Sequence, residues 1–143
     1  MGMDLATETF VVESSDRTEI TVITDRVVDA VADAGAETGL AVVDTGHTTA
    51  AVTTNEAEER LLRDILETFT DLVPPEEWYF HDQHHIDTDS QRNAWGHIVS
   101  AMVRGPVVTV VEDGALRLGT YEDVMLFEFD GPRRRTVDVT TLS

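Results

Sequence analysis

Residues 106–142, PVVTVVEDGALRLGTYEDVMLFEFDGPRRRTVDVTTL, contain four apolar, β-branched runs separated by turn residues. The turns fall at Glu112-Asp113-Gly114 and at Gly131-Pro132. Runs of this kind on either side of an Asp-Gly or Gly-Pro turn are typical of β-hairpins. The stretch therefore predicts two consecutive hairpins and, with them, an antiparallel sheet. The four predicted strands cover residues 106–111, 115–119, 122–130 and 136–142.

The N-terminal part of the chain adds further short strands. Residues 6–14 and 18–24 are β-branched runs on either side of Ser15-Asp16-Arg17, a pattern that predicts a third hairpin. Two apolar runs, at 40–44 and 48–54, predict buried strands.

Three segments have the apolar spacing of helices. The first covers residues 24–35, and the last covers 93–103. Between them, Asn55 and Glu58 have the spacing of a capping box for a helix that ends near residue 72. The apolar side chains of this middle helix form one stripe, which predicts that it packs in the core. The stripe consists of Leu61, Leu62, Ile65, Leu66, Phe69 and Leu72.

The order of these elements favours the α+β class. Consecutive strands are joined by tight turns, which indicates a mainly antiparallel β-sheet sandwich with two or three helices packed on it. The 143 residues, 41% of them hydrophobic, are expected to form one domain over 1–143. No apolar run approaches the roughly 20 residues of a membrane span, and the acidic N-terminus does not resemble a secretory signal. A cytoplasmic location is therefore expected.

The charge balance is strongly acidic. There are 28 Asp and Glu residues against 10 bases, all of them arginine, which gives a formal net charge of −18. This field repels phosphate backbones, so nucleic acid is not an expected partner. Concentrated salt would screen the self-repulsion, and we interpret the surface as halophilic. The absence of cysteine excludes thiol nucleophiles, disulfides and thiolate-bound metals.

Histidines are the first candidates for chemistry. Five occur, and four of them fall within residues 81–97, where helical and strand periodicity disappear. Neutral imidazole is a common ligand of transition metals, so this segment predicts a metal or catalytic site. No HExxH spacing is present, and the alternative interpretation is a solvated polar loop.

Two other polar clusters could bind an anion. Gly46-His47-Thr48-Thr49 ends a predicted strand and could present unpaired amides to an anion, or it could be an ordinary hydrogen-bonded turn. Arg133-Arg134-Arg135 is the one basic cluster, and guanidinium groups bind phosphate in bidentate fashion. Because side chains alternate along a strand, these arginines cannot all face one ligand, and pairing with acidic residues is the alternative.

Together these residues resemble the YjbQ-like family, whose members are described as secondary thiamine-phosphate synthases. The resemblance covers nearly the whole chain and implies a compact α+β domain that assembles as a homotrimer. The segments that carry it are His47-Thr48-Thr49-Ala50, Thr54-Asn55-Glu56, Tyr79-Phe80-His81-Asp82, Asn93-Ala94 with His97, Gly119-Thr120, and Glu128-Phe129-Asp130-Gly131-Pro132-Arg133-Arg134-Arg135.

The resemblance implies a transferase of thiamine biosynthesis. It would join a pyrimidine methyl diphosphate to a thiazole phosphate and release pyrophosphate, with a divalent metal ion, zinc or magnesium, as cofactor. The implied metal ligands are His47, His81 and His97. The implied catalytic residues are His47, His81, Asn55, Glu56 and Glu128. Thr48, Asn93 and Arg133 are expected to bind the phosphorylated substrate, and Asp82 matches a further polar position of the family.

The chain departs from the family pattern at several positions, which include Gly105-Pro106 in place of Gly-x-Ser and Tyr121 in place of a tryptophan. Val99 replaces a basic residue, Arg104 replaces a glycine, and Glu122 replaces the glutamine of a Gly-Thr-Trp-Gln motif. His84 and His85 match no family position. Two alternative functions stay open: a metal-dependent hydrolase with a three-histidine site, in which Glu56, Asp82 or Glu128 acts as base, and a non-catalytic trimer that binds a small anion or a metal.

Overall fold

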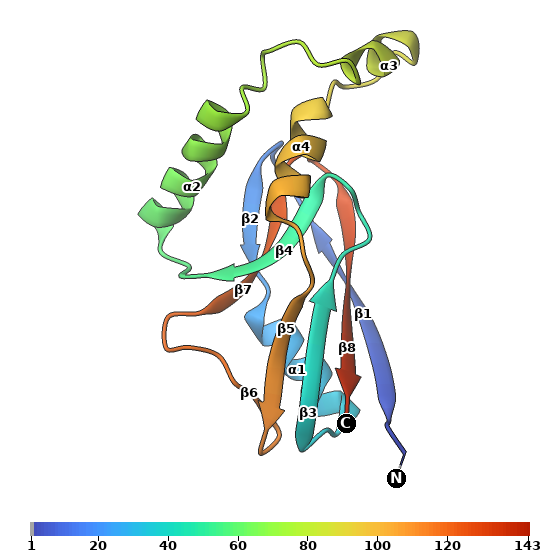
Figure 1. The fold of residues 1–143 in the computed structure, drawn as a ribbon, viewed down its shortest axis with the longest axis vertical. Coiled ribbons are helices and arrows are strands. Elements are labelled where there is room, and N and C mark those ends of the chain that lie inside the picture. Colours follow the sequence, from blue (N-terminus) through green and yellow to red (C-terminus); the bar gives the residue numbers. More distant parts are fainter. Residues whose placement is uncertain (1) are drawn as a thin grey trace.

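The computed structural model describes residues 2–143 as two antiparallel sheets and four helices (Figure 1). The larger sheet has the strand order β1-β8-β3-β5-β6, and the smaller has the order β2-β7-β4. The strands are β1 (Leu5–Glu13), β2 (Glu19–Val22), β3 (Thr38–Asp44), β4 (Ala50–Asn55), β5 (Val107–Glu112), β6 (Ala115–Leu116), β7 (Asp123–Glu128) and β8 (Arg134–Leu142). The helices are α1 (Thr24–Ala34), α2 (Glu59–Leu72), α3 (Asp82–Asp87) and α4 (Ala94–Val103).

The small sheet lies between two apolar clusters because its side chains alternate between its two faces. Val52 and Leu126 point to the first cluster, which also holds apolar side chains of the large sheet and of α1. Met125 and Phe127 point to the second, where they meet Trp95 of α4 and the partly buried face of α2. The predicted α+β class with mainly antiparallel sheets is confirmed, with four helices rather than two or three.

Two of the three predicted hairpins are wrong. Strands β1 and β2 follow one another but lie in different sheets, where β1 pairs with β8 and β2 with β7. Likewise β7 and β8 lie in different sheets. The two connections bond to each other, since Ser14 N donates to Arg133 O at 2.9 Å and Gly131 N to Arg17 O at 3.0 Å. A turn signal marks where a strand ends, whereas the partner of the next strand depends on tertiary packing. Only the β5–β6 hairpin is confirmed.

The helices begin and end close to the predicted positions. Gly35 ends α1 in the left-handed conformation, with φ of 69°. The predicted capping box of α2 is wrong: Glu58 is the N-cap, its carboxylate accepts from Leu61 N at 2.8 Å, and Asn55 still belongs to β4. The stripe of α2 was expected in the core, yet no residue of this helix is fully buried.

Helix α3 and its flanking loops lie beyond one end of the sheets, next to the first turn of α4 (Figure 1). The chain termini meet at the opposite end, where the backbones of Asp4 and Ser143 exchange two hydrogen bonds. None of the helices described over residues 2–143 combines the length and apolarity that a bilayer crossing requires.

Candidate functional site

Three segments meet around a polar cavity of about 360 Å³. They are the loop between β3 and β4, the start of α4, and the connection between β7 and β8. Each segment follows or precedes a buried strand or helix, so the rigid elements hold the loop side chains in place. The cavity is lined by Gly46, His47, Thr48, Thr49, Asn93, His97, Asp130, Arg133 and Arg135.

A buried ion pair forms the base of this region. Arg135 and Glu128 have side-chain exposures of 4% and 2%, and Arg135 Nε donates to Glu128 Oε1 at 2.9 Å. The guanidinium group also donates to Thr49 Oγ1 at 2.7 Å, while the carboxylate accepts from Ser14 Oγ at 2.7 Å. Glu128, predicted as a catalytic residue, therefore lies in a saturated network that fixes Thr49 and β8.

A second buried carboxylate organises the polar side chains that face the cavity. Asp130 accepts hydrogen bonds from Asn93 Nδ2 at 2.8 Å, Gln91 Nε2 at 3.0 Å and Arg133 Nη2 at 2.8 Å. Its side chain is 1% exposed, whereas that of Arg133 is 49% exposed. The arginine is thus fixed at its Nε and Nη2 edge, while its other edge donates no hydrogen bond to residues 2–143 and the residue lines the cavity.

His47 is held in one orientation by β8. Thr136 N donates to His47 Nε2 at 3.1 Å. Because a backbone N–H can only donate, Nε2 is the unprotonated nitrogen and the neutral ring carries its proton on Nδ1. Burial lowers the pKa of His47, and the charge of Arg135 lowers it further. The ring is therefore neutral near pH 7.

His97 and His81 lie side by side, with ring centroids 4.9 Å apart. Burial lowers the pKa of His97, and the neighbouring His81 acts in the same direction. His84 and His85 also surround His81, at centroid distances of 5.5 Å and 4.8 Å. The histidine-rich segment is thus a cluster of four rings, and His97 is the member that also lines the polar cavity.

An apolar cavity of about 430 Å³ adjoins His97 from the other side. Its walls are Tyr79, Phe80, His81, Ala94, His97 and Ile98. Phe80 is 95% exposed, so an aromatic face stands open to solvent at the edge of this cavity. His97 is therefore shared by a charged cavity and an apolar one.

Asn55 and Glu56 lie away from this region. Asn55 is the last residue of β4 and Glu56 follows it, and the six residues of this strand, Ala50–Asn55, span roughly 20 Å. Asn55 Oδ1 accepts from Glu56 N at 2.8 Å, and both residues line a surface depression together with Gly119, Thr120, Tyr121 and Glu122. Within one chain, the predicted site residues therefore form two groups.

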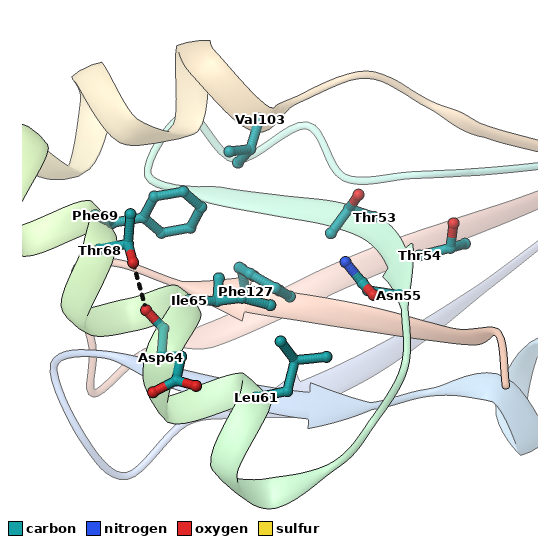
Figure 2. A pocket seen from close by; sticks show the side chains of 10 residues that line it. All are labelled: Thr53, Thr54, Asn55, Leu61, Asp64, Ile65, Thr68, Phe69, Val103 and Phe127. Atoms are coloured by element: carbon teal, nitrogen blue, oxygen red, sulfur yellow. Dashed lines mark hydrogen bonds between the residues drawn. The ribbon is translucent and has the colours of Figure 1, made fainter.

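Asn55 also reaches the mouth of a cavity of about 410 Å³ beneath α2 (Figure 2). Leu61, Ile65 and Phe69 project from the helix toward Phe127 of the sheet. Thr68 Oγ1 donates to the Asp64 carbonyl within the helix, so these polar groups need no partner in the cavity. Among the residues that the structure describes, no histidine or arginine lines this cavity, so its walls offer no positive charge to a phosphate.

In this structure, the three histidines expected to bind a metal are not arranged around one ion. His81 and His97 are adjacent, but the unprotonated nitrogen of His47 already accepts from Thr136. Across residues 2–143, no three side chains of the ligating types are arranged around a common ion position. A three-histidine site would require the ring of His47 to turn away from β8.

Two residues of this region were not predicted to belong to a site. Asp130 orients Asn93 and Arg133, and the only signal in the sequence is its place before Gly131-Pro132 in the FDGPRRR segment. Arg104 donates to the carbonyls of His47, at 2.7 Å, and of Thr45. Nothing in the sequence near residue 104 indicates this contact, because the loop it reaches lies 57 residues away.

Comparison with known proteins agrees with this architecture. Residues 8–143 match the family described as "UPF0047 protein YjbQ-like". The chain belongs to the YjbQ-like family. A UPF0047 protein of Archaeoglobus fulgidus is 42% identical over 130 residues, which cover 91% of this chain and 96% of the relative. YugU of Bacillus subtilis is 33% identical over 130 residues, covering 90% and 93%.

Solved structures of YjbQ-like proteins share the fold. A YbjQ-like protein of unknown function from Sulfolobus solfataricus has a TM-score of 0.91 at 30% identity, with 99% of each chain covered. A YjbQ/UPF0047 protein of Clostridium acetobutylicum has a TM-score of 0.85 at 32% identity, with 94% of this chain and 98% of that chain covered.

Three of the departures from the YjbQ-like pattern have different surroundings. Val99 is fully buried against the second apolar cluster. Glu122 accepts from Gly119 N at 3.0 Å, so its carboxylate closes a local turn. Arg104 bonds to the backbone beside His47 and is the one departure that contacts the polar cavity's own loop.

Proposed function

We propose that this YjbQ-like protein joins a pyrimidine methyl diphosphate to a thiazole phosphate, with release of pyrophosphate. The observation that carries the proposal is the pair of cavities that share His97. The substrates combine a flat ring with a phosphate, and the two cavities offer an apolar wall and a charged one. Their volumes, about 360 and 430 Å³, are in the range of small-molecule sites.

The polar cavity supports binding of the anionic end. Arg135, Arg133 and Arg104 all lower the pKa of His47, whereas Glu128 raises it less than Arg135 lowers it. At the ring of His47 these charges therefore act together as a net positive charge, within a chain of net charge −18. The open edge of Arg133 and the Nδ1–H of His47 are hydrogen-bond donors. They could stabilise the negative charge that develops on pyrophosphate as it leaves.

The chemistry of the step needs no free base. The ring nitrogen of the thiazole attacks the methylene carbon, the bond between that carbon and the diphosphate oxygen breaks, and its electron pair leaves with pyrophosphate. The nitrogen becomes cationic and no proton is transferred. Of the three carboxylates that a hydrolase could use as a base, Asp82 and Glu128 are buried and paired with arginines, and Glu56 lies away from the histidines of its own chain. The occupied carboxylates thus favour transfer over hydrolysis.

The proposal includes the assembly and the cofactor that family membership suggests. In a homotrimer, Asn55 and Glu56 of one subunit could approach the histidines of another, which one chain cannot bring together. A divalent cation, zinc or magnesium, would neutralise the diphosphate if His47 turned toward His81 and His97. The reaction would then take place in a salt-rich cytoplasm.

The proposal is tested by incubating the protein in molar KCl with both substrates and measuring thiamine phosphate by mass spectrometry. His97→Ala should abolish product formation, because this ring lines both cavities. The matched control is His84→Ala, which removes a ring that lines neither cavity. Hydrolysis of the diphosphate without the thiazole would indicate a hydrolase instead, and tight binding without turnover would indicate a binding protein.

Metal analysis tests the cofactor separately. Protein purified in molar salt without a nickel column should carry a divalent ion if the cofactor proposal is right. Loss of that ion in His81→Ala and its retention in His84→Ala would place it at the predicted ligands.

A further inference from the structure

Arg104 ties the end of α4 to the loop that carries His47. It is the C-cap residue of this helix, and its guanidinium group donates to the carbonyls of Thr45 and His47. The side chain is 30% exposed and lies 4.0 Å from Asp44, the last residue of β3. One planar group therefore bonds to two alternate peptide units of the same loop, a contact for which the guanidinium fork is suited.

The guanidinium group of Arg104 determines where the N–H group of each of these two peptide units points. In a trans peptide, the C=O and N–H groups point in opposite directions. The carbonyl of Thr45 shares its peptide plane with the N–H of Gly46, and the carbonyl of His47 shares its plane with the N–H of Thr48. Since Arg104 holds both carbonyls, both N–H groups are turned away from the guanidinium group.

The two N–H groups belong to residues that line the polar cavity. Gly46 and Thr48 line it, while Arg104 does not. Within residues 2–143, neither N–H group donates a hydrogen bond to another part of the chain, whereas the intervening His47 N–H donates to Thr45 Oγ1 at 3.4 Å. Two unpaired donors thus border the cavity that also holds Arg133 and His47.

We propose that Arg104 is a positioning residue that turns the Gly46 and Thr48 amides into a backbone site for a phosphate group. Consecutive amides around a concave turn bind anions in many proteins. Here they complement the open edge of Arg133 across the cavity. The inference rests on the proposed anion site and adds to it the backbone donors and the residue that orients them.

The test uses inorganic phosphate and the 143-residue chain in molar KCl. In wild-type protein, phosphate should shift the amide resonances of Gly46 and Thr48 in ¹H–¹⁵N spectra. Arg104→Met should remove those shifts and raise the Kd for phosphate about tenfold, the effect of losing about 1.4 kcal/mol of binding free energy. Arg104→Lys should lose as much, because an ammonium group cannot hold both carbonyls in one plane.

The control is Arg117→Met, which removes the same charge from an exposed arginine that pairs with Glu112. It should leave the Kd unchanged, and thermal melting will show that each variant is folded. Wild-type affinity in Arg104→Lys would show that charge alone matters and would overturn the inference. Phosphate binding that leaves the two amides unshifted would also overturn it while leaving the anion site intact. No phosphate binding by wild-type protein would refute the anion site itself.

Discussion

The buried pair of Arg135 and Glu128 makes a strong prediction about stability. In the variant Arg135→Met, a side chain of similar length loses its charge and its donors. Glu128 then stays 2% exposed, with only Ser14 Oγ and Asp130 N as donors. Removal of one partner leaves an uncompensated buried charge, which typically costs about 3–5 kcal/mol.

The structure favours the upper half of this range. Arg135 Nε lies within 2.9 and 3.2 Å of the two carboxylate oxygens, and the same side chain donates to Thr49 Oγ1 and to the Thr49 carbonyl. All of these bonds are lost together in the methionine variant. In the double variant Arg135→Met with Glu128→Gln, the charge is gone as well, so we expect about half of the lost free energy of unfolding to be regained.

The assay is urea denaturation in molar KCl, with the free energy of unfolding extrapolated to zero urea. Arg134→Met is the matched control, because it removes the same charge from the adjacent, exposed position of β8. We expect that control to change the free energy by less than about 0.5 kcal/mol. A loss below about 1 kcal/mol for Arg135→Met, or no recovery in the double variant, would refute the structural role of the pair.

Four further outcomes are expected. The melting temperature should rise from low to molar KCl, because salt screens the net charge of −18, and a flat curve would remove the halophilic interpretation. Light scattering in high salt should give the mass of a homotrimer, whereas a monomer at micromolar concentration would contradict that proposal. His81→Ala should abolish phosphate or metal binding and product formation with little change in melting temperature, and full retention of both would remove His81 from the site. The pKa values of His47 and His97 are lowered in the folded chain, so unfolding takes up protons below about pH 6.5. The free energy of unfolding should therefore fall between about pH 7 and pH 5.5, by less in His97→Ala, and a pH-independent free energy would contradict the neutral histidines.

The sequence predicted the kind of each element better than its partner. Apolar spacing indicated α1, α2 and α4, and Gly35 marked the end of α1, because both signals act within a few residues. The false hairpins arose where the chain crosses from one sheet to the other. Pairing of β1 with β8 joins residues more than 120 positions apart, and no local signal specifies such a contact.

The candidate site was predictable where family motifs lie in loops. His47, Asn93, His97 and Arg133 do line one cavity, and His81 lies against His97. The support beneath them was not predictable, since two of the donors to the buried Asp130, Gln91 and Asn93, lie 39 and 37 residues away in the sequence. Asn55 and Glu56 share the motif but not the cavity, because β4 separates them from His47.

The central position of β8 has a consequence for biosynthesis. This strand lies between β1 and β3, yet it is the last strand to leave the ribosome. Synthesis proceeds at about 5–20 residues per second, so β1 has an unpaired edge for several seconds until β8 has been made. Glu8 on β1 and Asp44 on β3 lie on the two strands that β8 later joins, and charged side chains on an unpaired strand disfavour its pairing with other chains. The acidic side chains of these strands would thus also oppose aggregation of the incomplete chain.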